Sequence, residues 1–437
     1  MPDARASPNA TDHGITIIDR SGRPLERLWL AVSGHGHGHL VQVSPLVRAL
    51  RARHPGLRVA VQSSLPADLL TRQLGDVAQV HGEAADVGMA MSGPMTVLPA
   101  ESLAAYRRFH AAWPELLAAQ VTRLREFGPD LVIGDVPYLP LAAAKACGVR
   151  SVAVCSLNWA DVLEHYCTGL DGADGIVRSI RGHYAAADLF LRPSPAMPME
   201  TLGNTRRIGP LVTVGRSRRA ELRRALGLAE GTRLVLLTLG GIAGGIDVSR
   251  WPPFEDTCFL LPDAWRSRAP WPGGPGRFRS IESAGMPFAD LFASCDALIA
   301  KPGYGAFAGA GCSALPVLFV ERGDWPEEPC LRAWLERVGR ATSMGRAELV
   351  EGRFARALDG LLARPPTPCV EASGAAEALA LIETLLDPAR APARRDAPVE
   401  GRGIVGRPSG DGGGSARARG RGRASPPLAP RPDPPDP

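Results

Sequence analysis

Three histidines, His35, His37 and His39, alternate with glycines in the segment SGHGHGHLVQVSPLVRAL, which begins at residue 33. An apolar run precedes this segment and apolar residues at helical spacing follow it, which predicts a strand, a glycine loop and a helix. Gly36 and Gly38 let the backbone turn sharply and let a ligand approach closely. The positive end of the helix dipole disfavours a protonated histidine near His39. A neutral imidazole is what a general base needs, so we predict a ligand site with His39 as its base.

Two other interpretations of the repeat stay open. Histidines at alternate positions can bind a metal, but no second cluster of ligand residues at suitable spacing accompanies them, so no metal is predicted. They can also be incidental polar residues of a loop. We expect His35 and His37 to line the loop and His39 to carry the chemistry.

Asp135 ends the apolar run DLVIGDV at 130–136, which predicts a buried strand. In a parallel sheet the ligand crevice lies outside the carboxyl ends of the strands. His39 and Asp135 are therefore predicted to open into one crevice. A carboxylate there would hold the tautomer of the imidazole and stabilise its charged form. The alternative is that Asp135 only caps the following turn.

Further glycine loops and a pair of carboxylates follow predicted strands in the second half of the chain. The sequence TLGGIAGG at 238–245 suits a diphosphate, although it lacks the G-K-[ST] of a Walker loop. The loop IAKPGYG at 299–305 and the segment ERGDWPEEP at 321–329 are the other two candidates. The residues predicted to bind a donor are Gly240, Gly241, Lys301, Gly303, Tyr304, Gly305, Glu327 and Glu328.

Strands that are apolar throughout alternate with helices, which predicts α/β architecture with parallel sheets covered on both faces. The pattern starts again after residue 210, which indicates two Rossmann-like domains. We predict a loose extension at 1–25, an N-terminal domain at 26–210 and a C-terminal domain at 211–388. The Pro, Gly and Arg-rich segment 389–437 is predicted to be a disordered tail.

Charge, cysteine usage and hydropathy limit the function classes. The segment 389–437 holds ten arginines and five carboxylates and so carries the whole formal charge of +5. The folded part is near neutral, which argues against a nucleic-acid partner; the tail as a nucleic-acid arm is a weak alternative. The eight cysteines are scattered, as in a reduced compartment. Without an apolar membrane span or a signal peptide, a cytoplasmic protein with no integral membrane association is expected.

Taken in order, these segments resemble the GT-B-fold glycosyltransferases over about residues 27–385. The likeness is strongest to the glycosyltransferase-like N-terminal region of L-arabinokinase-type proteins. It extends more distantly to glycosyltransferase family 28, which includes the lipid-linked N-acetylglucosamine transferases, and to the UDP-glycosyltransferase superfamily. The resemblance implies two Rossmann-like domains facing across a cleft, with a nucleotide-sugar donor on the C-terminal side. A small-molecule or lipid-linked acceptor would then lie on the N-terminal side.

By resemblance, His39 is the base for an acceptor hydroxyl and Asp135 is its partner. The reaction implied is an inverting transfer with no required metal and no cofactor besides the nucleotide sugar as co-substrate. Gly309 stands where the family usually has an acidic residue that holds the ribose hydroxyls, which weakens the prediction of nucleotide binding. No sugar-kinase domain follows, so no arabinose-kinase activity is expected. A non-catalytic module that binds a sugar or a nucleotide sugar on the same fold, and a GT-B epimerase with Glu327 and Glu328 as acid and base, remain alternatives.

Overall fold

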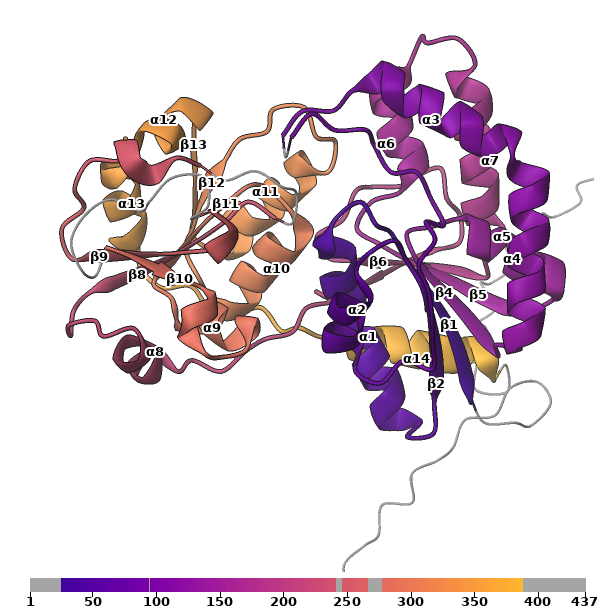
Figure 1. Cartoon of the computed structure of the whole chain (residues 1–437), viewed down its shortest axis with the longest axis horizontal. Coiled ribbons are helices and arrows are strands. Elements are labelled where there is room, and N and C mark those ends of the chain that lie inside the picture. The colour runs from indigo at the N-terminus through magenta and orange to yellow at the C-terminus, as the bar shows by residue number, and fades with distance from the viewer. Residues whose placement is uncertain (1–24, 94, 241–245, 266–276, 388–437) are drawn as a thin grey trace, which may run out of the picture. The chain divides into compact units, whose positions relative to one another are not determined.

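The computed structural model describes residues 25–93, 95–240, 246–265 and 277–387 (Figure 1). Three of the sequence predictions lie wholly or largely outside these described residues. They are the extension at 1–25, the tail at 389–437 and the donor residue Gly241. The two sheets predicted from the sequence are both within the described part of the chain.

The first sheet has seven parallel strands in the order β3-β2-β1-β4-β5-β6-β7. The bounds of its strands are β1 Arg27–Val32, β2 Arg58–Gln62, β3 Gln79–His81, β4 Leu131–Asp135, β5 Arg150–Val154, β6 Leu189–Pro193 and β7 Thr205–Ile208. The helices between them are α1 His37–Arg53, α2 Ala67–Leu74, α3 Pro99–Ala111, α4 Trp113–Phe127, α5 Leu139–Cys147, α6 Trp159–Cys167 and α7 Ala173–Ala185.

The second sheet has six parallel strands in the order β10-β9-β8-β11-β12-β13. The bounds of its strands are β8 Arg233–Thr238, β9 Thr257–Leu261, β10 Phe278–Ser280, β11 Ala297–Ala300, β12 Val317–Val320 and β13 Ala341–Met344. Its helices are α8 Arg219–Ala225, α9 Phe288–Ser294, α10 Tyr304–Ser313, α11 Glu328–Val338, α12 Arg346–Glu351 and α13 Ala355–Leu362, with short 3₁₀ turns at Val248–Arg250, Asp263–Trp265 and Glu282–Ala284.

Alternate side chains of each central strand enter different cores, because successive residues of a strand point to opposite faces. In β1, Leu28 and Leu30 pack with apolar residues of α1 and α2, whereas Trp29 packs with residues of α4 and α5. In β8, Leu234 and Val235 divide in the same way between two buried clusters. Burial on both faces explains why these strands are apolar throughout, and it confirms the predicted pair of Rossmann-like parallel sheets.

Apolar spacing alone predicts one helical stretch over 101–127, but the structure has two helices there. Helix α3 ends at Ala111 and α4 begins at Trp113, with Pro114 in the first turn of α4. Proline lacks the N–H that a continuing helix would donate, and its ring clashes with the carbonyl four residues earlier. The apolar periodicity did not distinguish one helix from two, but Pro114 marked the break.

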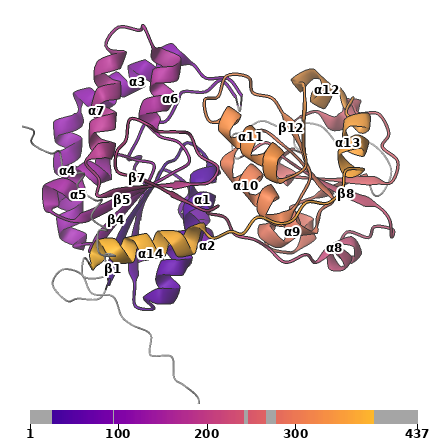
Figure 2. The ribbon, with the colours of Figure 1, turned by 180° about the vertical axis from the view of Figure 1, so that it is seen from behind.

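The last described helix, α14 at Gly374–Leu386, packs against the first sheet rather than the second (Figure 2). Its residues Ala378 and Ile382 belong to the buried cluster that contains Val43 and Val47 of α1. The chain therefore crosses between the two sheets twice, once after β7 and once before α14.

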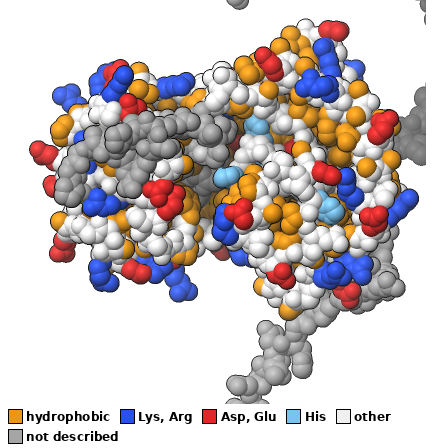
Figure 3. Space-filling model, in the orientation of Figure 1, with side chains coloured by type: hydrophobic (Ala, Val, Ile, Leu, Met, Phe, Trp, Pro, Cys, Tyr) orange, Lys and Arg blue, Asp and Glu red, His pale blue; other side chains and the backbone are white. Residues whose placement is uncertain are grey.

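Among the described residues, no helix is long and apolar enough to cross a membrane. On the face shown in Figure 3, acidic and basic side chains are interspersed over both halves of the described structure. That distribution matches the near-neutral charge inferred for the folded part from the sequence.

Candidate functional site at the carboxyl ends of the strands

The first half of the site lies where β1 and β4 end side by side. Val32 is in register with Asp135, and the backbone N–H of Ser33 donates to the carbonyl oxygen of Asp135 at 2.8 Å. From β1 the chain runs to β2 on one side, whereas from β4 it runs to β5 on the other. Such a switch point opens a crevice at the carboxyl ends of the strands, and the first turn of α1 faces it.

His39 and Asp135 meet in this crevice. The Nδ1 atom of His39 lies 2.9 Å from Oδ1 of Asp135, and Asp135 is fully buried. The side chain of His39 is 12% exposed, so it is the member of the pair that reaches the surface of the crevice. We assign the proton between them to Nδ1, because a carboxylate accepts and does not donate. This tautomer leaves Nε2 as the ring nitrogen that can take a proton from a substrate.

The surroundings shift the pKa of both members of the pair. Burial lowers the pKa of His39, but the hydrogen bond and charge of Asp135, together with the charges of Asp86 and Glu327, raise it above its usual value. Protonation of His39 is therefore favoured, contrary to the expectation from its place at the start of a helix. Burial raises the pKa of Asp135, against the stabilising effect of His39. A histidine whose charged form is stabilised in this way can hold a proton taken from a hydroxyl.

Two further side chains, Trp159 and His35, lie beside the pair; both belong to the half of the structure built on the first sheet, which we call the first lobe. The indole N–H of Trp159 donates to buried Asp86 at 2.7 Å, which fixes the ring of Trp159 near His39. The ring of His35 meets Trp159 edge-on with centroids 5.1 Å apart, and burial lowers its pKa to about 3. His35 is therefore neutral at ordinary pH. It lies beside the pair as an uncharged wall of the crevice.

A loop of the second sheet, between β12 and α11, enters the same crevice. Trp325 is buried in the apolar cluster of the first lobe that contains Trp159. The hydroxyl of Tyr166 in α6 donates to the backbone carbonyl of Asp324 at 2.9 Å, and the Arg322 guanidinium lies 4.3 Å from the ring centroid of Trp325. The burial of Trp325 and the Tyr166 hydrogen bond hold the loop against the elements of the first sheet, and the Arg322 contact lies within the loop itself.

The loop delivers the carboxylate of Glu327 to the pair. Glu327 is 4% exposed and accepts from the indole N–H of Trp325 at 3.2 Å and from the hydroxyl of Ser156. Its charge acts on His39, and burial raises the pKa of Glu327. Glu327 therefore belongs to the crevice.

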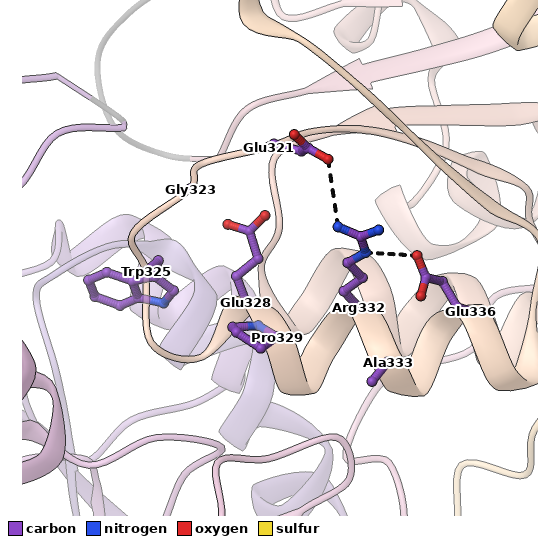
Figure 4. Close-up of a pocket in the computed structure, with 8 residues that line it drawn as sticks. All are labelled: Glu321, Gly323, Trp325, Glu328, Pro329, Arg332, Ala333 and Glu336. Carbon is purple, nitrogen blue, oxygen red and sulfur yellow. Dashed lines mark hydrogen bonds and ion pairs between the residues drawn. The ribbon is translucent and has the colours of Figure 1, made fainter. Parts of the chain in front are cut away.

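The neighbouring Glu328 serves a different place. It accepts from the backbone N–H of Arg322 at 3.2 Å and lines a pocket of about 430 Å³ at the start of α11 (Figure 4). In that pocket Arg332 lies between Glu321 and Glu336, with N···O distances of 3.6 and 2.8 Å. The two adjacent glutamates thus point to different surroundings and do not form one carboxylate pair.

The switch point of the second sheet brings together two loops predicted to bind a donor. Gly240 follows β8 and has φ +82°, and a Cβ there would lie 3.0 Å from Cε of Lys301, which follows β11. Glycine at 240 therefore leaves room for the lysine side chain. Burial, with the nearby charge of Arg322, lowers the pKa of Lys301 to about 8.

Gly303, Tyr304 and Gly305 form the start of α10. Gly303 precedes the helix, and a Cβ at Gly305 would lie 3.8 Å from Val41 of α1. The Tyr304 hydroxyl accepts from the backbone N–H of Leu211 at 2.7 Å. It is thus engaged with the segment that connects the two sheets, and donor binding by Tyr304 stays a prediction.

Replacing Tyr304 with phenylalanine is expected to lower the free energy of unfolding by about 1–3 kcal/mol. The substitution removes the acceptor of the Leu211 N–H, and Leu211 is fully buried. Chemical denaturation of the variant measures this change. A normal stability combined with a large rise in KM for a donor would instead place the hydroxyl in donor binding.

Gly36, His37 and Gly38, the remaining residues of the glycine-histidine loop, form the turn into α1. Gly36 has φ +153°, a conformation that favours glycine, and it precedes the first residue of α1. His37 is that first residue and is exposed, as is Gly38. The turn therefore presents His35 and His39 to the crevice.

Four residues of this crevice are not marked by the sequence patterns, namely Asp86, Cys155, Trp159 and Trp325. Cys155 and Trp159 follow β5, at the same edge of the sheet as Asp135, so the rule that selected Asp135 applies to them as well. Trp325 lies within the segment 321–329, where the charged neighbours Glu327 and Glu328 are the more evident candidates for binding. Asp86 lies in an irregular segment between β3 and α3, where no periodicity or motif marks it.

No protein-family model matches the chain. It is similar to L-arabinokinase of Arabidopsis thaliana, with 28% identity over 340 residues that cover 77% of this chain and 32% of the relative. The chain thus matches about a third of the length of that protein.

Solved structures with the same architecture include transferases and an epimerase. The glycotransferase of kitacinnamycin matches with a TM-score of 0.53 at 16% identity, over 82% of this chain and 94% of its own. A putative UDP-N-acetylglucosamine 2-epimerase from Listeria monocytogenes has a TM-score of 0.52 at 15% identity, over 83% and 97%. The spinosyn forosaminyltransferase SpnP has a TM-score of 0.50 at 17% identity, over 83% and 94%. The chain therefore has the GT-B-like fold that its sequence predicted.

Proposed function

We propose that this protein is a glycosyltransferase that moves a sugar from a nucleotide-sugar donor to an acceptor hydroxyl, with His39 as the base. The observation that carries the proposal is the contact of 2.9 Å between Nδ1 of His39 and Oδ1 of Asp135 at a strand switch point. The similarity to known proteins supports an enzyme of this fold, and the His–Asp pair supports the reaction class.

In the proposed reaction the acceptor oxygen attacks the anomeric carbon of the donor sugar. Its proton passes to Nε2 of His39 while the bond from the anomeric carbon to the diphosphate oxygen breaks. The bonding pair leaves with the diphosphate, so attack from the opposite side inverts the anomeric configuration. Asp135 stabilises the imidazolium through Nδ1. The protein contributes further by holding the two substrates in line.

On the donor side, Lys301 is the cation best placed to receive the diphosphate. It follows the central strand β11 and lies beside the glycine turn after β8, the arrangement in which a parallel sheet binds phosphates. Glu327 is a buried acceptor between this loop region and His39, where a sugar hydroxyl would find a partner. Both roles are part of the proposal.

A donor screen that reports nucleotide release tests the proposal, followed by acceptor identification with the donor that responds. Release that depends on an acceptor hydroxyl and gives an inverted product supports the transferase. Binding without turnover would favour the non-catalytic module, for which Gly309 is the argument, because glycine offers no acceptor to a ribose. Release without an acceptor, accompanied by an epimerised sugar, would favour the epimerase.

The pH dependence of kcat/KM is expected to have an acidic limb centred above pH 6.5. The neutral imidazole is the active form, and the net effect of burial and of the carboxylates Asp135, Asp86 and Glu327 is a raised pKa of His39. Activity therefore falls as the pH decreases through that raised pKa. Initial rates over a pH series measure the limb, and in Asp86→Asn it should move to lower pH. A limb below pH 6.5 would contradict this assignment of the base.

A further inference from the structure

Three side chains with metal-binding atoms converge in the crevice from three different elements. They are His39 in α1, Asp135 at the end of β4 and Cys155 directly after β5, and their ligand atoms all lie within 4.8 Å of one another. Nδ1 of His39 lies 2.9 Å from Oδ1 of Asp135 and 3.8 Å from Sγ of Cys155. Asp135 and Cys155 are fully buried.

We propose that this cluster is an inhibitory site for Zn²⁺, in which the ion takes Nδ1 of His39 and removes the base of the reaction. The proposal rests on the proposed function for its consequence but not for the binding itself. Imidazole nitrogen, carboxylate oxygen and thiolate sulfur are the donors that zinc prefers, whereas magnesium and calcium prefer oxygen alone.

The distances in the cluster are close to those of a tetrahedral zinc site. Bond lengths of about 2.05 Å to nitrogen and oxygen and about 2.3 Å to sulfur place N and S about 3.6 Å apart, and N and O about 3.3 Å apart. The corresponding distances in the protein are 3.8 and 2.9 Å. These two distances therefore need adjustments of only a few tenths of an ångström, and the thiol and carboxylate lie within 4.8 Å of each other.

Two buried oxygens of the crevice indicate that its polar groups can accept a further partner. Oδ2 of Asp135 and Oε1 of Glu327 have no hydrogen-bond partner among the residues that the structure describes. A buried polar atom without a partner is costly, and coordination of an ion relieves that cost. Glu327 acts on His39 and Cys155 through its charge and is not one of the converging ligands, so a water molecule would supply the fourth ligand.

The cluster is not arranged as a nucleophilic Cys–His–Asp relay. Such a relay uses both ring nitrogens, one toward the nucleophile and the other toward the carboxylate. Here Cys155 and Asp135 approach the same nitrogen, Nδ1 of His39. The imidazole therefore cannot pass a proton from the thiol while Asp135 holds it. The thiol of Cys155 also contacts the Asp135 carboxylate, so the three donor atoms face one another.

Binding at Nδ1 would abolish the action of His39 as a base. A neutral imidazole that gives its Nδ1 lone pair to a metal carries its proton on Nε2. The Nδ1 proton thus moves to Nε2, and the thiol of Cys155 releases its proton to solvent as the thiolate binds. An Nε2 that already carries a proton cannot accept one from the acceptor hydroxyl.

Titration of the full chain with Co²⁺, a spectroscopic substitute for Zn²⁺, tests the site without an activity assay. We expect a thiolate-to-cobalt charge-transfer band that saturates at one ion per chain and is displaced by Zn²⁺. Cys155→Ala should abolish the band, and Cys258→Ala, which alters a buried cysteine of the second sheet, should leave it in place. No band, or a band that survives Cys155→Ala, would overturn the proposal.

An activity experiment separates this proposal from the proposed function. Relative to its own rate in a chelator, the wild-type enzyme should be inhibited by Zn²⁺, and Cys155→Ala should raise the inhibitory concentration by at least about 100-fold. Loss of an outer-shell partner alone costs 10–100-fold in metal affinity, and loss of a direct ligand costs at least as much. A cobalt band in a protein that shows no sugar transfer would contradict the proposed function but support the metal site. Sugar transfer that Zn²⁺ does not slow would contradict the inhibitory role of the site but support the proposed function.

Discussion

Replacing His39 with alanine is expected to lower the rate of sugar transfer by about 10²–10⁴-fold, the range that a general base contributes. The substitution removes the only atom assigned to take the acceptor proton, Nε2, while the loops around Gly240 and Lys301 on the donor side are unchanged. Donor affinity should therefore stay close to that of the wild type. Steady-state rates and calorimetric titration with the donor found in the screen measure the two effects.

His37→Ala is the matched comparison for this experiment. His37 lies two residues earlier in the same turn, and its side chain is exposed at the first residue of α1. A loss that is much smaller than that of His39→Ala is expected, because His37 does not share the contact with Asp135. Equal losses in the two variants would point to damage of the loop, and unchanged turnover of His39→Ala would remove His39 from the mechanism.

Asp135→Asn is expected to lower transfer by about 10³–10⁴-fold, even though it preserves the size and shape of the side chain. An amide can donate to Nδ1 of His39, which moves the ring proton to Nε2 and leaves no base there. The 2.9 Å contact can remain, but the donor and the acceptor exchange roles, because the amide then donates to Nδ1. Nitrogen NMR of the imidazole measures the tautomer directly, alongside the rate.

Asp86→Asn provides a matched control for the buried carboxylate. Asp86 is also buried, but it accepts from the indole N–H of Trp159 and not from the imidazole. Its amide variant should keep the Nδ1–H tautomer of His39 and most of the rate at high pH. An unchanged tautomer and rate in Asp135→Asn would show that Asp135 does not direct the proton of His39.

The α/β architecture was predictable from the sequence because a strand that is buried on both faces is a run of apolar residues, which can be recognised locally. The strand Leu131–Asp135 is apolar up to its last residue, and glycines mark the turns after β1 and β8. The boundary between α3 and α4 was harder to predict, because the apolar spacing continues across it. There a single backbone constraint, at Pro114, decides the structure.

His39 and Asp135 are 96 residues apart in the chain, so their proximity in sequence could not predict the contact. It was predicted from the topology of a parallel sheet. Loop ends at a switch point meet whatever their sequence distance. The same rule applies to Cys155, but a cysteine in an apolar run looks like core. Asp86 lies in an irregular segment, so only its contact with Trp159 identifies it.

By itself the sequence determined the two parallel sheets, the glycine loops and the types of side chain at the strand ends. Tertiary structure alone decided which of those side chains share a crevice and which ring nitrogen faces Asp135. It also separated Glu327 from Glu328, which are adjacent in the chain but lie in different surroundings. The physical reason is that secondary structure is recorded in local periodicity, whereas contacts between loops depend on strand order and on how the two sheets meet.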